Sequence, residues 1–523
     1  MTKAPIDTSN ADADGIARSF GALLGGSAPS YFIKERPDGD FLMFEFASLN
    51  PRFFGLLSAA VQAVPVENKY KERVSISTRR KKPTTVLTTP EVDLLQAELS
   101  ASLTVDRNTF GDDFLARYTP SVTGLETKIV VNANNIVFGR RGSGKSSLLA
   151  YAMHQLRLKA LPYCWVAMQT YASREDQQAV ASVLSEIFSE ISMYADPSAS
   201  GGPFRDTAEE LSRMGEEENS ATVRSKLMRM VPRLRKLLSQ VARPDRVLTI
   251  FLDDVHVVGS ALQPDLLGFL YSLTRGNNVF LKLSGIEQLT NLWDGASGGR
   301  GLESPHDITL LKLDHNLTDP EQSKAHIQSI FDRHAKYCGL PNIGYLAEDD
   351  YFDRLVLAAA AVPRDAISLF LKSLARSVSK RQKQISVTSL NAAASAAIEE
   401  KLKDMVKDVE QADTAIVGRY LERVKKFCLT EQKKNSFLVK IANGTVGYSN
   451  IQKLVALRFI HVLHEGITPY KAGVRYVALM LDFGFYIGIR AAKSITLFPE
   501  RPKPLAAKDV RRLPILDPNH PPV

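Results

Sequence analysis

One segment of the chain has the residue types and the spacing to bind phosphate. Residues 139–146 read Gly-Arg-Arg-Gly-Ser-Gly-Lys-Ser, which satisfies the pattern G-x-x-x-x-G-K-[ST] in full. Glycines let the backbone curl so that successive N–H groups point at an anion. A strand-like run, 134–138, precedes the motif and a helix-like run, 146–155, follows it. A helix that begins at such a loop adds its positive end to the same anion.

This context predicts a nucleotide-binding loop. We expect Lys145 to reach the β- and γ-phosphates of ATP and the Ser146 hydroxyl to complete the coordination of Mg²⁺. A chance match in a chain of this length is expected on the order of once in a hundred sequences, so a nonfunctional glycine-rich turn is a poor alternative. The predicted loop comprises Gly139, Arg140, Arg141, Gly142, Ser143, Gly144, Lys145, Ser146 and Ser147.

A second polar element follows an apolar strand-like run, 247–252, which ends in Asp253 and Asp254. We expect Asp253 to hold Mg²⁺ through water and Asp254 to polarise the attacking water. Two acids at the end of a strand are a weak signal by themselves, because acids commonly lie at turns. Their position downstream of a complete phosphate loop makes the assignment strong.

Strand and helix patterns alternate between about residues 120 and 315, which predicts a mostly parallel sheet with helices on both faces. The expected core is therefore a three-layer α/β P-loop domain. An acidic stretch rich in small residues, 195–222, interrupts the alternation, and we expect it to be a mobile loop.

Taken together, these motifs resemble the AAA+ ATPases, and within them the origin-recognition-type initiator branch, over roughly residues 105–490. FGRRGSGKSSLL resembles the Walker A motif and TIFLDD the Walker B motif. The resemblance nominates Ser284, in LKLSG, as sensor 1 and Arg364, in AAVPRDA, as a sensor 2 contact to the γ-phosphate. It also implies an arginine finger, for which Arg300 and Arg275 are candidates, although an ordinary surface arginine is the alternative for each.

The acids depart from the family pattern. The Walker B motif of AAA+ proteins commonly ends in Asp-Glu, whereas here it ends in Asp253-Asp254, as in signalling ATPases of the STAND class. The shorter side chain moves its carboxylate by about an ångström, and misplacements of that size can cost ~100-fold in rate. We therefore expect slow, switch-like turnover.

The patterns divide the chain into six segments. Residues 318–409 have helical spacing, and 410–497 have the order of a winged helix. The expected segments are a flexible lead-in (1–28), an α+β segment (29–104), the ATPase core (105–317), a helical lid (318–409), a winged-helix-like domain (410–497) and an extended, Pro-rich basic tail (498–523).

The positive charge is concentrated near the C-terminus. Residues 401–523 hold 21 Lys and Arg against 11 Asp and Glu, whereas the whole chain has a net charge of +9. This favours a contact with double-stranded DNA or another polyanion, and solvated surface lysines are the alternative. Three widely spaced cysteines, with no export signal and no membrane-spanning run, predict a reducing cytoplasm and no membrane partner.

Two hypotheses from different classes follow. The first is an ATPase switch that uses ATP and Mg²⁺, assembles with itself or a partner protein, and acts on DNA through its C-terminal module. The second is a STAND-like signalling or scaffold ATPase, for example in bacterial antiphage defence, whose winged helix makes protein contacts. The expected recognition helix, 449–461, offers DNA only Lys453 and Arg458. We interpret His256, His461 and His464 as packing or surface residues.

Overall fold

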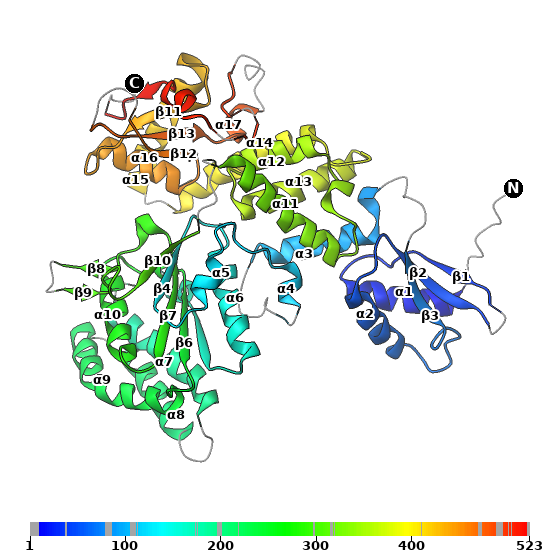
Figure 1. Ribbon diagram of the computed structural model, residues 1–523, viewed down its shortest axis with the longest axis horizontal. Coiled ribbons are helices and arrows are strands. Elements are labelled where there is room, and N and C mark those ends of the chain that lie inside the picture. Colours follow the sequence, from blue (N-terminus) through cyan, green and yellow to red (C-terminus); the bar gives the residue numbers. More distant parts are fainter. Residues whose placement is uncertain are drawn as a thin grey trace. The chain divides into compact units, whose positions relative to one another are not determined.

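The computed structural model forms two compact units, one made of Val105–Asp314 and the other of Met1–Thr104 with His315–Val523. Figure 1 shows the elements of each unit. Within the described ranges, no helix is long and apolar enough to cross a bilayer. The structure describes residues 10–36, 39–78, 86–104, 111, 113–172, 174, 176–195, 201–217, 219–295, 299–313, 317, 319–408, 411–468, 473–487, 495–499, 501–503 and 505–519.

The unit Val105–Asp314 is built on a parallel sheet of five strands in the order β10-β4-β7-β6-β5. Because β4, β7 and β6 are parallel neighbours, the carboxyl ends of these three strands lie side by side at one edge. The predicted α/β P-loop fold is therefore confirmed. The strands are β4 (Asn135–Phe138), β5 (Tyr163–Ala167), β6 (Leu248–Asp253), β7 (Val279–Gly285) and β10 (Thr309–Lys312).

Alternation along the strands explains why this sheet has helices on both faces. Ile250 and Leu252 of β6 belong to one buried cluster, and Phe251 between them belongs to another. Since successive side chains of a strand point to opposite faces, each face needs its own apolar cover. One cluster includes residues of α7 (Gln177–Ile191), α8 (Gly201–Met214), α9 (Ser220–Val241) and α10 (Leu262–Thr274), and the other those of α5 (Leu125–Ile129) and α6 (Lys145–Leu158) (Figure 1).

The expectation of a mobile loop over residues 195–222 is wrong. Helix α8 occupies much of this stretch, and α9 begins before the stretch ends. Phe204, Ala208 and Leu211 recur at helical spacing and are buried in the cluster that contains α7. This apolar face outweighs the acidic composition on which the expectation rested. Residues 196–200 lie outside the described residues.

The N-terminal part contains helices and strands, and a helix occupies residues 11–24 of the expected flexible lead-in. Helix α1 (Ala11–Leu24) buries Ile16, Phe20 and Leu24, because these apolar residues recur every four positions. Strand β2 pairs antiparallel with β1 and parallel with β3. The other elements are β1 (Tyr31–Lys34), β2 (Phe41–Phe46), α2 (Pro51–Gln62), β3 (Val74–Thr78) and α3 (Pro90–Ser102). Residues 1–9 lie outside the described ranges.

The expected lid and the module after it share a unit with this N-terminal part. The lid consists of α11 (Pro320–Tyr337), α12 (Asp349–Ala358), α13 (Pro363–Ser379) and α14 (Val387–Asp408). The module places a strand and a helix before an antiparallel hairpin, β12 with β13, which is winged-helix-like order. Its elements are α15 (Gln411–Lys426), β11 (Ser436–Lys440), α16 (Val446–Ala456), β12 (Ile460–Ile467) and β13 (Tyr476–Leu481).

The basic tail is packed, contrary to the expectation of an extended segment. Strand β14 (Ile515–Leu516) pairs parallel with β11, and the side chains of Val510, Leu513 and Leu516 are buried. A few apolar residues spaced among prolines and cations are enough to pack the tail against the module and to add β14 to the edge of its sheet. The tail is therefore part of the C-terminal module.

A buried ionic cluster joins the C-terminal module to the lid. Asp482, which is 5% exposed, accepts from Lys401 Nζ at 2.8 Å and lies 3.0 Å from His461 Nε2. It also accepts the backbone N–H of Gly484 at 2.9 Å. Burial alone would raise the pKa of Asp482, but the charges of Lys401 and His461 outweigh burial and hold this pKa well below its usual range. The interpretation of His461 as a packing residue therefore misses its polar role.

We predict that Asp482→Asn lowers the free energy of unfolding of this unit by about 3 kcal/mol at pH 7, because it leaves Lys401 without its partner. Urea denaturation measures the loss. Since the folded pKa is depressed, the stabilisation is present above the unfolded carboxyl pKa of about 4 and disappears as the pH falls below it. Glu399→Gln is the matched control, because Glu399 is exposed and lies in α14, the helix that contains Lys401. An equal effect of both substitutions at pH 7 would contradict the role of the cluster.

Candidate functional site

The predicted phosphate loop joins β4 to α6 and has a conformation that requires its glycines. Gly142 and Gly144 have φ angles of +84° and +98°, which side-chain-bearing residues rarely adopt. A Cβ on Gly139 would lie 2.5 Å from Ser143 Oγ and 2.7 Å from the Leu313 carbonyl oxygen. Helix α6 begins at Lys145, so the loop runs directly into a helix N-terminus.

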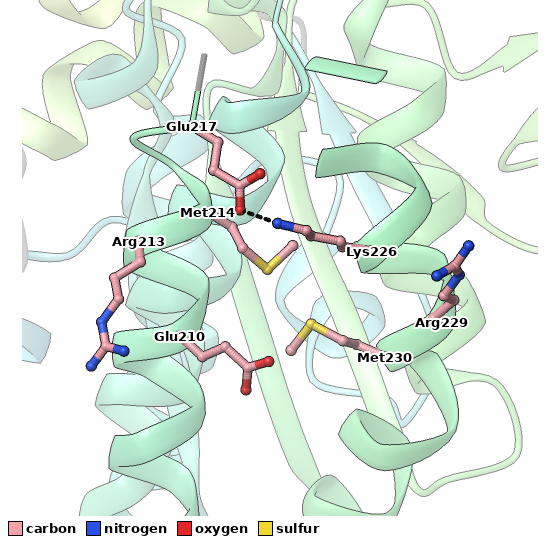
Figure 2. A pocket seen from close by; sticks show the side chains of 7 residues that line it. All are labelled: Glu210, Arg213, Met214, Glu217, Lys226, Arg229 and Met230. Carbon is pink, nitrogen blue, oxygen red and sulfur yellow. Dashed lines mark hydrogen bonds and ion pairs between the residues drawn. The ribbon is translucent and has the colours of Figure 1, made fainter. Parts of the chain in front are cut away.

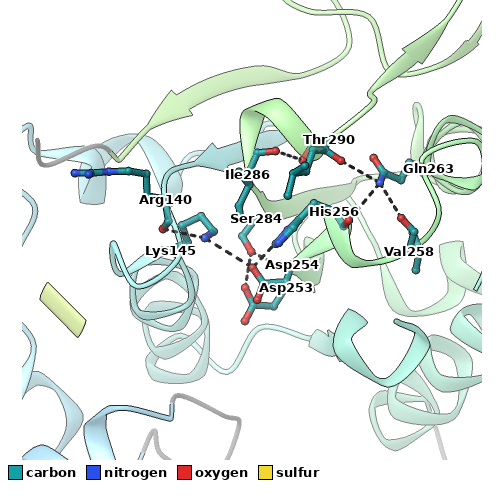
Figure 3. A network of polar contacts seen from close by, with 11 residues as sticks. Arg140, Lys145, Asp253, Asp254, His256, Val258, Gln263, Ser284, Ile286 and Thr290 are labelled. Carbon is teal, nitrogen blue, oxygen red and sulfur yellow. Dashed lines mark hydrogen bonds and ion pairs between the residues drawn. The ribbon is translucent and has the colours of Figure 1, made fainter. Parts of the chain in front are cut away.

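Lys145 lies between the loop and the second acid (Figure 3). Its side chain is 5% exposed, and Nζ lies 3.8 Å from Asp254 Oδ1. Nζ also donates a hydrogen bond to the carbonyl oxygen of Arg140 at 3.3 Å. The structure thus brings together the loop lysine and the acid that the sequence placed far apart along the chain.

Asp253 ends β6 and is almost fully buried, with 9% of its surface exposed. Its Oδ1 accepts a hydrogen bond from Ser284 Oγ at 2.5 Å, and the Ser146 hydroxyl is a second partner. Burial, with the charge of Asp254, raises the pKa of Asp253, while the two hydroxyl hydrogen bonds oppose the rise. The Ser146 hydroxyl, in the first turn of α6, and the Asp253 carboxylate, at the end of β6, are therefore neighbours that could both face a metal ion.

Asp254 has a different environment from its neighbour. Its φ of +61° is left-handed, a conformation that costs a non-glycine residue on the order of 1–3 kcal/mol and is common at functional sites. Its side chain is 37% exposed, so solvent can reach this carboxylate. The two acids therefore differ in exposure, and their division into metal ligand and water-polarising residue stays a prediction.

Ser284, in β7, holds the two acids in place. Its fully buried hydroxyl donates to Asp253 and accepts the backbone N–H of Asp254 at 2.7 Å. This second bond helps to fix the left-handed turn. Ser284 is thus a positioning residue for both acids, and a contact to the γ-phosphate stays a prediction.

His256 is part of the site, although its sequence context suggested only packing or surface exposure. Its Nδ1 lies 3.8 Å from Asp254 Oδ1. Burial lowers the pKa of His256 to about 4, despite the opposing effect of the Asp254 charge. The imidazole is therefore neutral at pH 7 and does not form an ion pair. Its place two residues after Asp254 was the one sequence signal available.

Gln263, which the sequence did not single out, ties together the loops that follow β6 and β7. Its Nε2 donates to the carbonyl oxygen of Val258 at 2.9 Å (Figure 3). Nε2 also donates to the carbonyl oxygen of Leu289 at 3.2 Å, and Oε1 accepts from the backbone N–H of Asn291 at 2.6 Å. An amide inside an apolar helix face gives no functional signal, so sequence reasoning had no means of finding it.

The residues present fit ATP and Mg²⁺. The Ser143 hydroxyl is buried inside the loop and has no hydrogen-bond partner in the described part of the chain. Among the described residues there is no group of three or more His, Cys, Asp or Glu that could hold a metal ion. Mg²⁺ commonly uses one or two protein oxygens, with water and phosphate completing its shell. Ser146 would supply one such oxygen, and Asp253 would hold the ion through water.

The arginines predicted to act as an arginine finger or as sensor 2 lie in different parts of the structure. Arg300 Nη1 lies 3.1 Å from Asp265 Oδ1, and the Arg275 guanidinium lies over the ring of Tyr271 at 5.7 Å. These contacts give each arginine a local structural role, and action on a neighbouring copy stays a prediction. Arg364 is the second residue of α13 in the other unit, and its sensor role also stays a prediction. Ser147 lies in the first turn of α6, and Arg141 is exposed.

Residues 131–281 match the family model described as the AAA ATPase domain. The match contains the phosphate loop and both acids, and it supports the resemblance to AAA+ ATPases drawn from the motifs. No curated protein matches the chain.

Solved structures resemble the chain only distantly. The ORC1 protein of Aeropyrum pernix in complex with DNA has 12% identity and a TM-score of 0.37, covering 74% of this chain and 93% of its own. A Walker-type ATPase of Pyrococcus abyssi has 12% identity and a TM-score of 0.40, covering 75% and 99%. Cdc6p of Pyrobaculum aerophilum has 13% identity and a TM-score of 0.34, covering 71% and 93%. At these scores nothing that those proteins bind is transferred to this chain.

We predict that Lys145→Met weakens ATP binding by about 10- to 100-fold, because hydrogen bonds to charged groups contribute about 1.5–3 kcal/mol. Methionine fills the buried space, so the fold should persist. Fluorescent-nucleotide titration measures the affinity. Lys159→Met, at the exposed end of the same helix, should bind ATP as the wild type does. Unchanged affinity in a folded Lys145→Met protein would rule out the assigned role.

The two acids should separate by function. We expect Asp253→Asn to impair the binding of ATP with Mg²⁺, whereas Asp254→Asn should retain binding and lose hydrolysis. Parallel measurements of Mg²⁺-dependent ATP affinity and phosphate release distinguish the two variants. An equal loss of binding in both would show that the division of labour is wrong.

Proposed function

We propose that the protein is an ATP-dependent switch that binds ATP with Mg²⁺ and hydrolyses it slowly. The observation that carries this proposal is the convergence of Lys145, Asp253 and Asp254 at the carboxyl edge of the parallel sheet. Phosphate binding needs a loop with a cation, and hydrolysis needs a carboxylate that water can reach. The unit Val105–Asp314 supplies both.

Each residue has a role in this mechanism. Lys145 and the loop N–H groups bind the β- and γ-phosphates, and Ser146 with Asp253 would hold Mg²⁺. Bound Mg²⁺ would neutralise part of the negative charge that develops on the phosphates. Asp254 orients and polarises the attacking water, while Ser284 keeps both acids in place. The short side chain of Asp254 places its carboxylate farther from that water, which accounts for slow turnover.

We also propose that the protein self-assembles and acts on DNA or on a DNA-bound partner. The net charge of +10 over residues 401–523 supports a polyanion partner. Slow hydrolysis would then set the lifetime of the assembled, ATP-bound state.

A second candidate function, signalling or scaffolding through protein contacts, is favoured by one contact. Arg458 Nη1 lies 2.6 Å from Asp365 Oδ1 in the first turn of α13. The side chains are 23% and 16% exposed. One of the two cations expected to face DNA is thus bound to the lid, beside the predicted sensor residue Arg364. The winged-helix-like module would in this case report on the lid.

The test is phosphate release by the full chain with and without duplex DNA, alongside its mass in solution with and without ATP. We expect turnover ~100-fold below the typical ~10 s⁻¹, stimulation by DNA and an ATP-dependent increase in mass. Hydrolysis and assembly without any response to DNA would favour the signalling candidate.

Asp254→Glu tests the reason for slow turnover. The longer side chain matches the usual AAA+ motif, and we expect it to raise the hydrolysis rate by about tenfold or more. Asp245→Glu, at an exposed turn of the same unit, is the matched control. An unchanged rate with Asp254→Glu would remove side-chain length as the explanation.

A further inference from the structure

Helix α9 has an unusual charge composition. Its 22 residues, Ser220–Val241, include six Arg or Lys and no Asp or Glu. The phosphate site does not use this helix, and the sequence analysis did not single it out. Its cations divide into three groups by the direction in which they lie.

Four of the six cations are satisfied inside the unit. Toward α10, Arg224 Nη2 lies 3.4 Å from Asp265 Oδ1, and Arg235 Nη1 donates to the Ser272 carbonyl oxygen at 2.6 Å. Toward α8, two further ion pairs form. Lys226 Nζ lies 2.6 Å from Glu217 Oε1, and Arg233 Nη1 lies 2.8 Å from Glu210 Oε2.

The remaining cations, Arg229 and Lys236, are exposed, and so is Arg243 just beyond the helix. Within the described ranges none of the three has a carboxylate partner. Arg229 and Lys236 are seven residues apart, so they lie on one side of α9 about 10 Å from each other. Arg243 follows after the helix has ended at Val241. We call these three residues the α9 stripe. Asp245, exposed in the following turn, is the acid nearest to it in sequence.

The neighbouring groove shows why the α9 stripe stays positive. The groove has a volume of about 340 Å³ and is lined by residues of α8, α9 and the segment after α8. Figure 2 shows the Lys226–Glu217 pair across it, and Arg229 among the residues that line it. The carboxylates of Glu210 and Glu217 are thus neutralised by Arg233 and Lys226. They do not offset the charge of the stripe.

We propose that the α9 stripe binds the phosphate backbone of duplex DNA. All charges on this face of the helix have one sign, and small exposed residues, Ser225, Pro232 and Ser239, lie along it. Among the described residues of α9, Met228 is the one large apolar side chain that is exposed, at 57%, whereas protein interfaces usually rest on several large anchors. Phosphate contacts need only cations on an accessible surface. The proposal rests on DNA as the partner in the proposed function, but it places the contact on the ATPase unit.

The test compares two triple variants of the full chain that remove the same charge. One is Arg229→Gln with Lys236→Gln and Arg243→Gln. The control is Lys380→Gln with Arg381→Gln and Lys383→Gln, at exposed positions after α13. Affinity for a fluorescent duplex of mixed sequence is measured over a series of salt concentrations.

Neutralising one phosphate contributes about 0.9 to the slope of log affinity against log salt. The stripe variant should therefore lose about 2.7 from the slope and at least tenfold in affinity at low salt, while the control keeps the wild-type slope. Equal losses in both variants, or no wild-type binding at low salt, would overturn the proposal. Competition by polyglutamate as strong as competition by unlabelled duplex would overturn it as well and assign the stripe to an acidic protein.

Failure of this inference can be distinguished from failure of the proposed function. The stripe variant should retain basal ATP hydrolysis, because none of its three positions belongs to the phosphate site. ATP hydrolysis and assembly without stripe-dependent DNA binding would leave the switch intact and overturn only the stripe. Stripe-dependent DNA binding without ATP hydrolysis would support the α9 stripe and overturn the ATP-dependent switch.

Discussion

The candidate site depends on one buried hydroxyl. Ser284 donates to Asp253 and accepts from the backbone of Asp254, and it can do so because β7 lies between β4 and β6 in the sheet. The strand order therefore brings the phosphate loop and both acids to one edge. It also allows one acid to stay buried while the next turns, in a left-handed conformation, toward solvent and Lys145.

Much of this core could be predicted from the sequence, because its signals are local. The glycine and lysine spacing of residues 139–146 and the apolar run before Asp253 each specify their own conformation. Contacts between distant segments could not be predicted. The position of His256 beside Asp254 and the link through Gln263 depend on how the loops after β6 and β7 pack. Composition suggested a mobile loop where α8 forms and an extended tail where the chain packs, whereas a few spaced apolar residues decide both structures.

The net charge of a sequence segment and the positions of its charges in the fold lead to different predictions of which cations can bind a partner. The excess of positive charge at residues 401–523 predicts that the C-terminal module binds a polyanion. However, Arg458 forms an ion pair with Asp365, and Lys401 forms one with Asp482. In the ATPase unit, α9 has its own excess, and its ion pairs leave one side of the helix positive. A cation's availability to a partner thus depends on its neighbours in the fold more than on the net charge of its segment.

The central claim is that the loop at residues 139–146 and the two acids after β6 form a Mg²⁺-dependent ATP site. Calorimetric titration of the full chain with ATP, in Mg²⁺ and in excess EDTA, tests it most directly. We predict binding at one site per chain with micromolar affinity, about −8 kcal/mol, which weakens at least tenfold when Mg²⁺ is removed. The absence of ATP binding, or binding of equal strength with and without Mg²⁺, would contradict it.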